Sequence, residues 1–465
     1  MNHDLIIIGG GSAGYAAART ATGLGLKAAV VDGAEELSGL CILRGCMPSK
    51  TLLASSTRFQ TIRHAEEFGL RASGLEVRGD EIIARKRRLV HEFASYRQQQ
   101  LASGKFELVR GTARFTGPHT IEVALREGGT RTMDAPTFIV ATGSVISEPP
   151  LASLREVGCW NSDDVLDNEY LPASVVLLGG GAIAVELATY YAGLGRKTTV
   201  IQRSEHLLKG TDTDIADALA DGLRDRGIEL YTGTKLLGAT KTANGKRVEF
   251  EHAGKTLTVE AEEIINCLGR SPNISGLDLP QAGIAVKHDH PVVQTTQQTS
   301  QPHVFAAGDV ASPYEIVHIG IQQGEIAARN AAKLIRSSAE PLEHTDYRLK
   351  LYAIFSDPEV AACGASEHEL REAGTEFRVA TYPFNDHGKS MTMGETDGFV
   401  KLIAARNGEL LGGAVVGPHA SELIHEIVVA MRFHATAAQL ATTPHYHPTL
   451  SEIWTYPAEE LAEIS

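Results

Sequence analysis

The sequence predicts an α/β fold in which one strand–turn–helix–strand unit occurs twice, followed by a separate α+β region. The first observation is an internal repeat: the glycine cluster Gly9–Gly14 recurs, at an offset of 170 residues, as Gly179–Ala184. The second is the setting of each cluster, which follows an apolar run and opens an alanine-rich helical pattern. The third is the region beyond residue 344, where short strand-like runs such as Gly398 to Ala404 precede helical patterns.

Size, charge and apolar content exclude several classes of protein. A chain of 465 residues exceeds one hydrophobic core and should divide into several domains. The net charge of −14 argues against a nucleic acid bound through a basic face. No apolar run reaches the length of a membrane-spanning helix, and the first apolar strand starts too close to Met1 to leave room for a signal peptide. We therefore expect no membrane partner and a cytoplasmic location.

Each glycine cluster has the features of a dinucleotide-binding turn. The first glycine permits a sharp turn, the second lets the backbone approach a pyrophosphate, and the third, or an alanine, allows close helix–strand packing. The helix that follows presents unpaired N–H groups and a positive dipole end to the phosphates. Ordinary loop glycines are the alternative, but two copies in matching contexts argue against it. The glycines predicted to contact cofactors are Gly9, Gly11, Gly14, Gly179 and Gly181.

The two units differ where the ribose is recognised. Asp32 ends the second strand of the first unit, where a carboxylate can hydrogen-bond a ribose hydroxyl. The equivalent position of the second unit is Gln202, followed by Arg203. Loss of the acid and gain of a guanidinium suit a 2′-phosphate, so the sequence favours NADP over NAD. A solvated surface charge is the alternative for Arg203.

Three further apolar strands end in small or acidic residues that predict ligand contacts. They are the runs Thr137–Gly143, Glu263–Arg270 and Val304–Asp309. An acid at the carboxyl end of a strand in an α/β sheet points into the ligand crevice. Asp309 is therefore a candidate to bind the ribityl chain of a flavin. The cofactor contacts predicted in these runs are Thr142, Gly143, Gly269 and Asp309.

Two cysteines, Cys41 and Cys46, lie five positions apart at the predicted start of a helix. The positive end of that helix would lower the pKa of the Cys46 thiol and favour the thiolate. Lys50 follows Cys46 by one turn and lies on nearly the same face of the predicted helix. A zinc site would need further ligands at short spacing, and none lie nearby. We predict a redox-active pair, with coincidental spacing as the alternative. The other cysteines, expected to be buried small hydrophobes, are Cys159, Cys267 and Cys363.

In these motifs and their order, the chain resembles the flavoprotein disulfide reductases that bind two dinucleotides. This family includes dihydrolipoamide dehydrogenase, glutathione reductase and mercuric reductase, and the resemblance runs essentially end to end. The carboxyl-terminal segment is especially close to dihydrolipoamide dehydrogenases. The segments that carry the resemblance are Gly45–Lys50, Ala141–Gly143, Leu268–Arg270, Ala307–Asp309 and His445–Glu452.

The resemblance implies two Rossmann-like dinucleotide-binding domains and a carboxyl-terminal α+β dimerisation domain. It implies FAD and NAD or NADP as cofactors, and a homodimer whose active site is shared between subunits. Four segments follow: the first part of the FAD-binding domain, 1–147; the NAD(P)-binding domain, 148–270; the second part of the FAD-binding domain with the central domain, 271–344; and the dimerisation domain, 345–465.

The resemblance also assigns roles to individual residues. It makes Cys46 the thiol that faces the flavin and Cys41 the one that exchanges with substrate. Lys50 is expected to pair with Glu186 beside the flavin. His447 and Glu452 are expected to form an acid–base pair that reaches the cysteines of the other subunit. Further flavin contacts are expected to include His318.

Histidine chemistry agrees with this assignment, because thiol–disulfide exchange needs a base that titrates near neutrality. His445 could instead be a packed structural residue, or form a metal site with His447.

Some positions around the cysteine pair depart from the family. The family usually has threonine before the first cysteine, where this chain has Leu40. It often has asparagine and valine inside the pair, where this chain has Leu43 and Arg44. Arg44 could favour an anionic substrate or simply form a surface salt bridge.

The leading hypothesis is therefore a dihydrolipoamide dehydrogenase-like enzyme, in which electrons pass from a small dithiol through the cysteine pair and FAD to the nicotinamide. The same residues run in reverse would make an NADPH-dependent reductase of another small disulfide. A flavin-only soluble transhydrogenase or NAD(P)H oxidase would leave the cysteines and His447 redundant. A flavin-bearing binding subunit without turnover is the remaining alternative.

Overall fold

The computed structural model describes residues 2–311 and 313–463. The chain forms two compact units, each assembled from three separate stretches of sequence. Unit 1 comprises Met1–Pro48, Arg85–Ser147 and Arg270–Asp346, and unit 2 comprises Ser49–Ala84, Glu148–Gly269 and Tyr347–Ser465. The four-segment division expected from the sequence stays a prediction.

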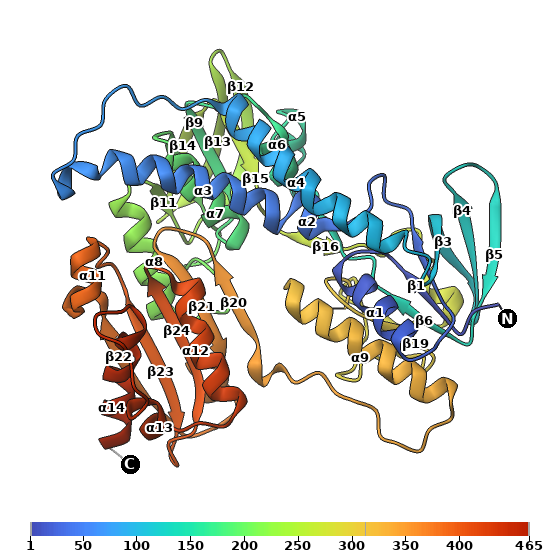
Figure 1. Ribbon diagram of the computed structural model, residues 1–465. Coiled ribbons are helices and arrows are strands. Elements are labelled where there is room, and N and C mark those ends of the chain that lie inside the picture. Colours follow the sequence, from blue (N-terminus) through green and yellow to red (C-terminus); the bar gives the residue numbers. More distant parts are fainter. Residues whose placement is uncertain (1, 312, 464–465) are drawn as a thin grey trace. The chain divides into compact units, whose positions relative to one another are not determined.

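Unit 1 is built on a seven-stranded sheet with the order β19-β6-β1-β2-β3-β4-β5 (Figure 1). The pairings from β19 to β3 are parallel, and the last two are antiparallel. Every residue of β1, β2, β6 and β19 is buried, as expected for parallel strands covered on both faces. The strands are β1 (Leu5–Ile8), β2 (Ala28–Asp32), β3 (Glu107–Gly117), β4 (Thr120–Leu125), β5 (Thr130–Asp134), β6 (Thr137–Val140) and β19 (Val304–Ala306).

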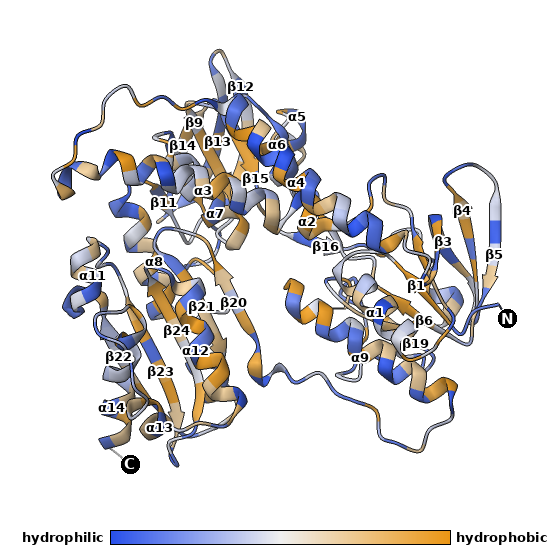
Figure 2. Cartoon of the chain, viewed as in Figure 1, coloured by the Kyte–Doolittle hydropathy of each residue, from blue (hydrophilic) through white to orange (hydrophobic). Residues whose placement is uncertain are grey.

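Two helices of unit 1, α1 (Ser12–Gly23) and α9 (Val317–Ile335), pack against each other at very short range. A β-carbon on Gly324 would overlap the backbone of Ala13, so small residues permit the approach. The predicted strand, turn and alanine-rich helix are present as β1, the turn after it and α1. In Figure 2, strands β1 and β6 of the sheet carry hydrophobic colours.

Unit 2 repeats this arrangement with a five-stranded parallel sheet of order β11-β10-β9-β15-β8. A three-stranded antiparallel sheet, β12-β13-β14, is inserted before β15. The elements are β8 (Trp160–Asn161), β9 (Ser174–Leu178), α7 (Ala182–Gly193), β10 (Lys197–Ile201), α8 (Thr213–Asp225), β11 (Glu229–Tyr231), β12 (Lys235–Thr242), β13 (Gly245–His252), β14 (Lys255–Ala261) and β15 (Glu263–Asn266).

The carboxyl-terminal part of unit 2 has the α+β architecture predicted for it. Its five-stranded antiparallel sheet has the order β20-β21-β24-β23-β22. Helix α12 packs on β21 and β24, and α14 packs on β22 and β23 (Figure 1). The elements are β20 (Leu351–Ile354), β21 (Glu359–Gly364), β22 (Phe377–Pro383), β23 (Phe399–Ala405), β24 (Leu410–Gly417), α12 (Ala420–Arg432) and α14 (Thr455–Glu463).

The remaining elements complete the fold, and several of them carry candidate site residues. In the described part of the chain, no helix is both long and apolar enough to cross a membrane. The remaining helices are α2 (Leu40–Arg44), α3 (Cys46–Arg63), η1 (Ala65–Phe68), α4 (Gly79–Leu101), α5 (Ala152–Glu156), α6 (Ser162–Asp167), η2 (Leu279–Ala282), η3 (Tyr347–Leu349), α10 (Glu367–Glu372), η4 (Phe384–Asp386), α11 (Gly388–Met393), α13 (Ala437–Ala441) and η5 (Ser451–Trp454). The remaining strands are β7 (Ser144–Ile146), β16 (Arg270–Pro272), β17 (Val286–Lys287) and β18 (His290–Pro291).

Candidate active site

The glycine turn of unit 1 leaves the amino terminus of α1 open for a ligand. Gly9 has φ +106°, and a β-carbon there would overlap the carbonyl of Ala141, so the turn requires glycine. Gly11 caps α1 without any side-chain hydrogen bond to the first turn. The N–H groups at this helix end are therefore available to an anion such as a phosphate.

Asp32 lies against this turn at the end of β2. Its Oδ2 accepts a hydrogen bond from the Gly10 N–H at 2.8 Å, and its Oδ1 accepts one from the Ala34 N–H at 2.8 Å. The residue is 6% exposed. The carboxylate is thus held in a fixed orientation by the turn itself and has lone pairs left for a ribose hydroxyl.

The segment with the two cysteines packs directly on the glycine turn. Gly39 caps α2, and a β-carbon on it would lie 2.6 Å from the Cα of Gly11. The sequence predicted one helix start for both cysteines, but Cys41 lies inside the five-residue helix α2, and Cys46 is the first residue of α3. Gly45 separates them, with a backbone conformation (φ −136°, ψ −115°) that belongs to neither helix. Both cysteines are half-buried.

Lys50 and Glu186 are brought together, as the resemblance implied. The Lys50 Nζ lies 2.8 Å from Oε1 and 2.7 Å from Oε2 of Glu186, which belongs to α7. Glu186 is 7% exposed and also accepts a hydrogen bond from the Phe355 N–H at 3.1 Å. The Lys50 ammonium lies 4.7 Å from the centre of the Phe355 ring. The ion pair is therefore ordered by three elements of unit 2.

The carboxyl ends of β6 and β19 bring polar groups together in unit 1. Asp309 accepts a hydrogen bond from the Ser144 hydroxyl at 2.7 Å, and Arg270 donates to that same hydroxyl and to the Ser144 carbonyl, both at 2.8 Å. Thr142 Oγ1, next to this group, is buried and finds no hydrogen-bond partner among the residues that the structure describes. Burial raises the pKa of Glu315, and Asp309 adds to the shift while Arg270 opposes it. Of the other predicted contacts, Gly143 adjoins Ser144 in the chain, and His318 lies in the first turn of α9.

The second glycine turn has the same backbone form. Gly179 has φ +116°, and a β-carbon on it would lie 2.5 Å from the Cys267 carbonyl oxygen. Gly181 caps α7 without a side-chain hydrogen bond. Gln202 covers the turn, because a β-carbon on Gly180 would lie 2.9 Å from its side chain. Two other predicted contacts are Gly269, which has open space around it, and Arg203, which is exposed.

The predicted acid–base pair is also brought together. His447 Nδ1 lies 3.0 Å from Glu452 Oε2, and the side chains are 80% and 13% exposed. His445 is instead packed, with Nε2 2.6 Å from Glu426 Oε1 and Nδ1 2.8 Å from the Thr443 carbonyl. Those two contacts occupy both nitrogens of His445, which favours the structural alternative over a metal site.

Sequence reasoning missed a second histidine at Glu452. His387 lies between η4 and α11, and its Nε2 is 3.5 Å from Glu452 Oε1. It belongs to no motif, and nothing in the local pattern indicates where it folds. Sequence reasoning also missed Ser144 and Arg270 as partners at Asp309.

The expectation for the remaining cysteines was right only in part. Cys363 is buried, but Cys159 and Cys267 are half-buried. Burial raises the pKa of Cys159 to about 11, with Lys246 opposing the shift, and raises that of Cys267 to about 12. The Cys159 thiol also donates to the Leu154 carbonyl at 3.0 Å. These thiols are therefore weak nucleophiles at neutral pH.

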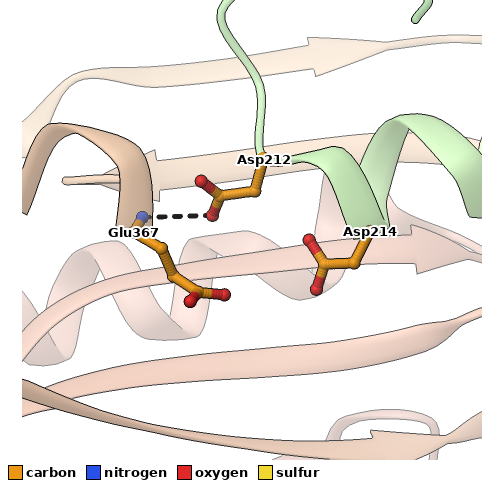
Figure 3. Close-up of side chains that lie close together, drawn as sticks. All are labelled: Asp212, Asp214 and Glu367. Carbon is orange, nitrogen blue, oxygen red and sulfur yellow. Dashed lines mark hydrogen bonds between the residues drawn. The ribbon is translucent and has the colours of Figure 1, made fainter. Parts of the chain in front are cut away.

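Three carboxylates of unit 2 lie close enough together to suggest a cation site. Figure 3 shows Asp212 and Asp214, at the start of α8, facing Glu367 of α10. Lys401, which is 0% exposed, has its Nζ 2.8–2.9 Å from all three. Burial disfavours the charged forms of Lys401 and Asp212. The hydrogen bonds of this cluster outweigh this effect, so the pKa of Lys401 is raised and that of Asp212 is lowered. The ammonium fills the space between the carboxylates, so the cluster is an internal ion-pair network.

Comparison with known proteins agrees with this arrangement. The sequence profile of the pyridine nucleotide-disulphide oxidoreductases matches residues 3–324, and the dimerisation-domain profile of the same class matches residues 351–458. The chain belongs to this family. The resemblance seen in the motifs is thereby confirmed, and with it the fold class. The protein is an FAD-dependent oxidoreductase that acts on sulfur groups and uses a nicotinamide nucleotide.

The relatives are similar over nearly their whole length. The chain is 34% identical to a dihydrolipoyl dehydrogenase of Bacillus subtilis over 461 residues, covering 97% of this chain and 96% of the relative. It is 36% identical to that of Thermus scotoductus over 457 residues, covering 97% and 95%. Among solved structures, LpdA of Mycobacterium tuberculosis has a TM-score of 0.87 at 27% identity, covering 98% of this chain and 99% of that one. The flavoprotein disulfide reductase RclA of Escherichia coli has 0.84 at 25%, with 98% and 99% covered.

Proposed function

We propose that this oxidoreductase is a homodimeric dihydrolipoyl dehydrogenase-like enzyme that oxidises a small dithiol or a lipoyl group. The observation that carries the proposal is the packing of the cysteine segment on the glycine turn, where Gly39 meets Gly11. This packing holds a cysteine pair at the turn expected to bind the flavin nucleotide. The length and identity of the matches to dihydrolipoyl dehydrogenases support the substrate class.

The residues of unit 1 fit FAD. The uncapped start of α1 offers N–H groups to a pyrophosphate, Asp32 is oriented toward a ribose, and the buried Thr142 hydroxyl needs a partner. We assign the flavin nucleotide to the segments 1–147 and 271–344, the nicotinamide nucleotide to 148–270, and the dimer interface to 345–465. When bound, the flavin supplies the electron transfer between the Cys46 thiolate and the nicotinamide.

The protein's own residues carry the thiol chemistry. One substrate thiolate attacks Cys41 Sγ, the Cys41–Cys46 bond breaks, and a mixed disulfide forms while Cys46 leaves as a thiolate. The second substrate thiolate attacks the substrate sulfur bonded to Cys41, which releases the oxidised disulfide and the Cys41 thiolate. The two thiol protons leave the substrate: His447 accepts one at Nε2 while Glu452 stabilises the imidazolium, and the other passes to solvent. In the homodimer, His447 serves the cysteines of the partner subunit.

NAD is the nicotinamide acceptor in this proposal. The NADP preference predicted from Gln202 and Arg203 is not supported by the relatives, which belong to a class that usually uses NAD. The backbone N–H of Arg203 donates a hydrogen bond to Gln202 Oε1 at 3.1 Å. Its guanidinium is exposed, and the amide of Gln202 is the group that covers the glycine turn.

Thiol titration under anaerobic conditions tests the central claim. Adding one equivalent of NADH to oxidised holoenzyme should expose two new thiols, and Cys46→Ser should expose none. No new thiols in the unmodified enzyme would contradict the proposal and favour flavin-only chemistry. His447→Gln should lower dithiol turnover by at least about 100-fold but leave flavin reduction by NADH intact. Turnover within a few-fold of the unmodified enzyme would remove His447 from this role.

A second candidate is the reductase of a different, anionic small disulfide. It is favoured by Arg44, an exposed cation on the last turn of the helix that holds Cys41. Steady-state assays with lipoamide, glutathione disulfide and related disulfides, each with NADH and NADPH, separate the two candidates. Arg44→Gln should leave kcat/KM for neutral lipoamide unchanged and should lower it for an anionic disulfide if that is the substrate.

A further inference from the structure

His387 is a buried histidine that faces the predicted acid–base pair. Its side chain is 0% exposed, and its Nδ1 lies 2.9 Å from the Ser390 Oγ. Its Nε2 lies 3.5 Å from Glu452 Oε1, at the outer limit of a hydrogen bond. Among the described residues, this Nε2 has no hydrogen-bond partner. A buried, unsatisfied ring nitrogen aimed at a functional carboxylate needs an explanation.

We propose that His387 is a positioning residue that donates from Nε2 to Glu452, so that two imidazoles hold this carboxylate between them. His447 contacts Oε2 and His387 faces Oε1, so each ring uses a different oxygen. This inference rests on the proposed role of the His447–Glu452 pair. It adds a residue that touches neither substrate nor cofactor and acts through Glu452.

The contact between His387 Nδ1 and the Ser390 hydroxyl is compatible with a ring proton on Nε2. If the Ser390 hydroxyl donates to Nδ1, the ring proton must be on Nε2, which then points at Glu452. Burial lowers the pKa of His387, which outweighs the opposing effect of Glu452, and His447 lowers it further. Burial therefore favours the neutral form of His387, which can donate from one ring nitrogen.

The other groups around His387 keep it in place without competing for Glu452. The Tyr456 ring of α14 meets it edge-on, with ring centres 6.4 Å apart, and Tyr456 stacks on Tyr382 at 3.9 Å. The neighbouring Asp386 carboxylate is engaged by the Tyr382 hydroxyl at 2.9 Å. Contacts at this range commonly tighten when the reacting complex forms, so a small shift of Glu452 would complete the hydrogen bond.

Substitution of His387 tests the inference through the pH profile. In His387→Leu, Glu452 keeps one donor only, so its charge acts on His447 alone and the apparent pKa of the base rises. In the pH profile of kcat for dihydrolipoamide oxidation, we expect the acid limb to shift to higher pH by at least about half a pH unit. We expect kcat to fall about tenfold with KM unchanged, because the orientation of the base is lost and no substrate contact is removed.

Two further variants separate donation from packing. His387→Gln retains an N–H near the position of Nε2 and should restore kcat to within about threefold and the pH limb to within about 0.2 unit. Ser390→Ala removes the contact that sets the ring proton and should shift the limb in the same direction by a smaller amount. Equal losses of kcat in His387→Leu and His387→Gln would show that His387 only packs, and would overturn the inference. If His387→Leu does not fold, His387→Gln and Ser390→Ala decide.

A matched control is His3→Leu, because His3 is also a buried histidine paired with a glutamate, Glu107, at 2.6 Å. It lies in unit 1, and its loss should leave the pH profile unchanged. The His447→Gln result keeps this test distinct from that of the proposed function. If His447→Gln abolishes dithiol turnover while His387→Leu keeps normal kcat and pH profile, the acid–base pair stands and the role of His387 is wrong. If His447→Gln keeps turnover, the proposed pair itself fails.

Discussion

The two glycine turns share one backbone form, but they present different groups to a ligand. Gly9 and Gly179 have nearly the same φ, and each lies against a backbone carbonyl at the end of the neighbouring strand. In unit 1 the turn is locked by a carboxylate, because Asp32 accepts the Gly10 N–H. In unit 2 the equivalent space is covered by the side chain of Gln202. Turn shape is thus set by backbone sterics, whereas the residue that ends the second strand sets ligand recognition.

The largest expected effect comes from exchanging the residues at the third position of the two turns, Gly14 and Ala184. A β-carbon on Gly14 would overlap the carbonyl oxygen of Gly9. Gly14→Ala should therefore lose bound FAD and about 3 kcal/mol of stability, measured by flavin fluorescence and chemical unfolding. Ala184→Gly, the reverse change in unit 2, should cost only about 0.5–1 kcal/mol from backbone entropy. Similar costs for both changes would contradict the difference between the turns.

Removing the side chain that covers each turn should have the next largest effect on the free energy of unfolding. Asp32→Ala leaves the N–H groups of Gly10 and Ala34 without their acceptor, and we expect a loss of about 2 kcal/mol in unfolding free energy. Gln202→Ala should cost less than about 1 kcal/mol, because its side chain accepts a hydrogen bond from the adjacent Arg203 N–H and donates a long one, 3.5 Å, to the His206 carbonyl. If Gln202→Ala were as costly as Asp32→Ala, both turns would depend equally on their covering side chain.

Nucleotide preference gives a smaller, more specific effect. If Arg203 binds a 2′-phosphate, Arg203→Glu should raise the KM for NADPH about tenfold and leave that for NADH within twofold, because only NADPH carries the extra charge. If Arg203 is only a surface charge, as the proposed use of NAD expects, both constants should stay within twofold. Lys197→Glu, at an exposed position of the preceding strand β10, is the control for general loss of positive charge. A similar rise in KM for NADPH in both variants would exclude specific recognition.

The smallest expected effect concerns the residues against which the two turns pack, Ala141 in unit 1 and Cys267 in unit 2. Burial raises the pKa of the Cys267 thiol to about 12, so it stays protonated at pH 8 and should not react with iodoacetamide in the native enzyme. Cys267→Ala, which copies unit 1, should change unfolding free energy by less than about 1 kcal/mol. Rapid labelling of Cys267, located by peptide mass analysis, would contradict this expectation.

The sequence indicated the fold well where local sterics and periodicity decide the structure. The apolar runs before Gly9 and Gly179 are buried strands, and the alanine-rich segments after them are helices. The split of the cysteine segment into α2 and α3 was not anticipated, because it depends on Gly39 packing against a turn far away in sequence. The partners of Asp309 and the presence of His387 at Glu452 were missed for the same reason.

Local sequence patterns indicated two sets of candidate residues, the repeated glycine turns and the closely spaced Cys41 and Cys46, whereas the pairing of His447 with Glu452 was implied by the family resemblance. The local patterns are short-range properties, set by allowed backbone angles and side-chain chemistry. Only the tertiary structure decided that Lys401 fills a cluster of three acids, and that a buried His387 faces Glu452. Such contacts join distant segments, so they exist only once the sheets and helices have packed around a common core.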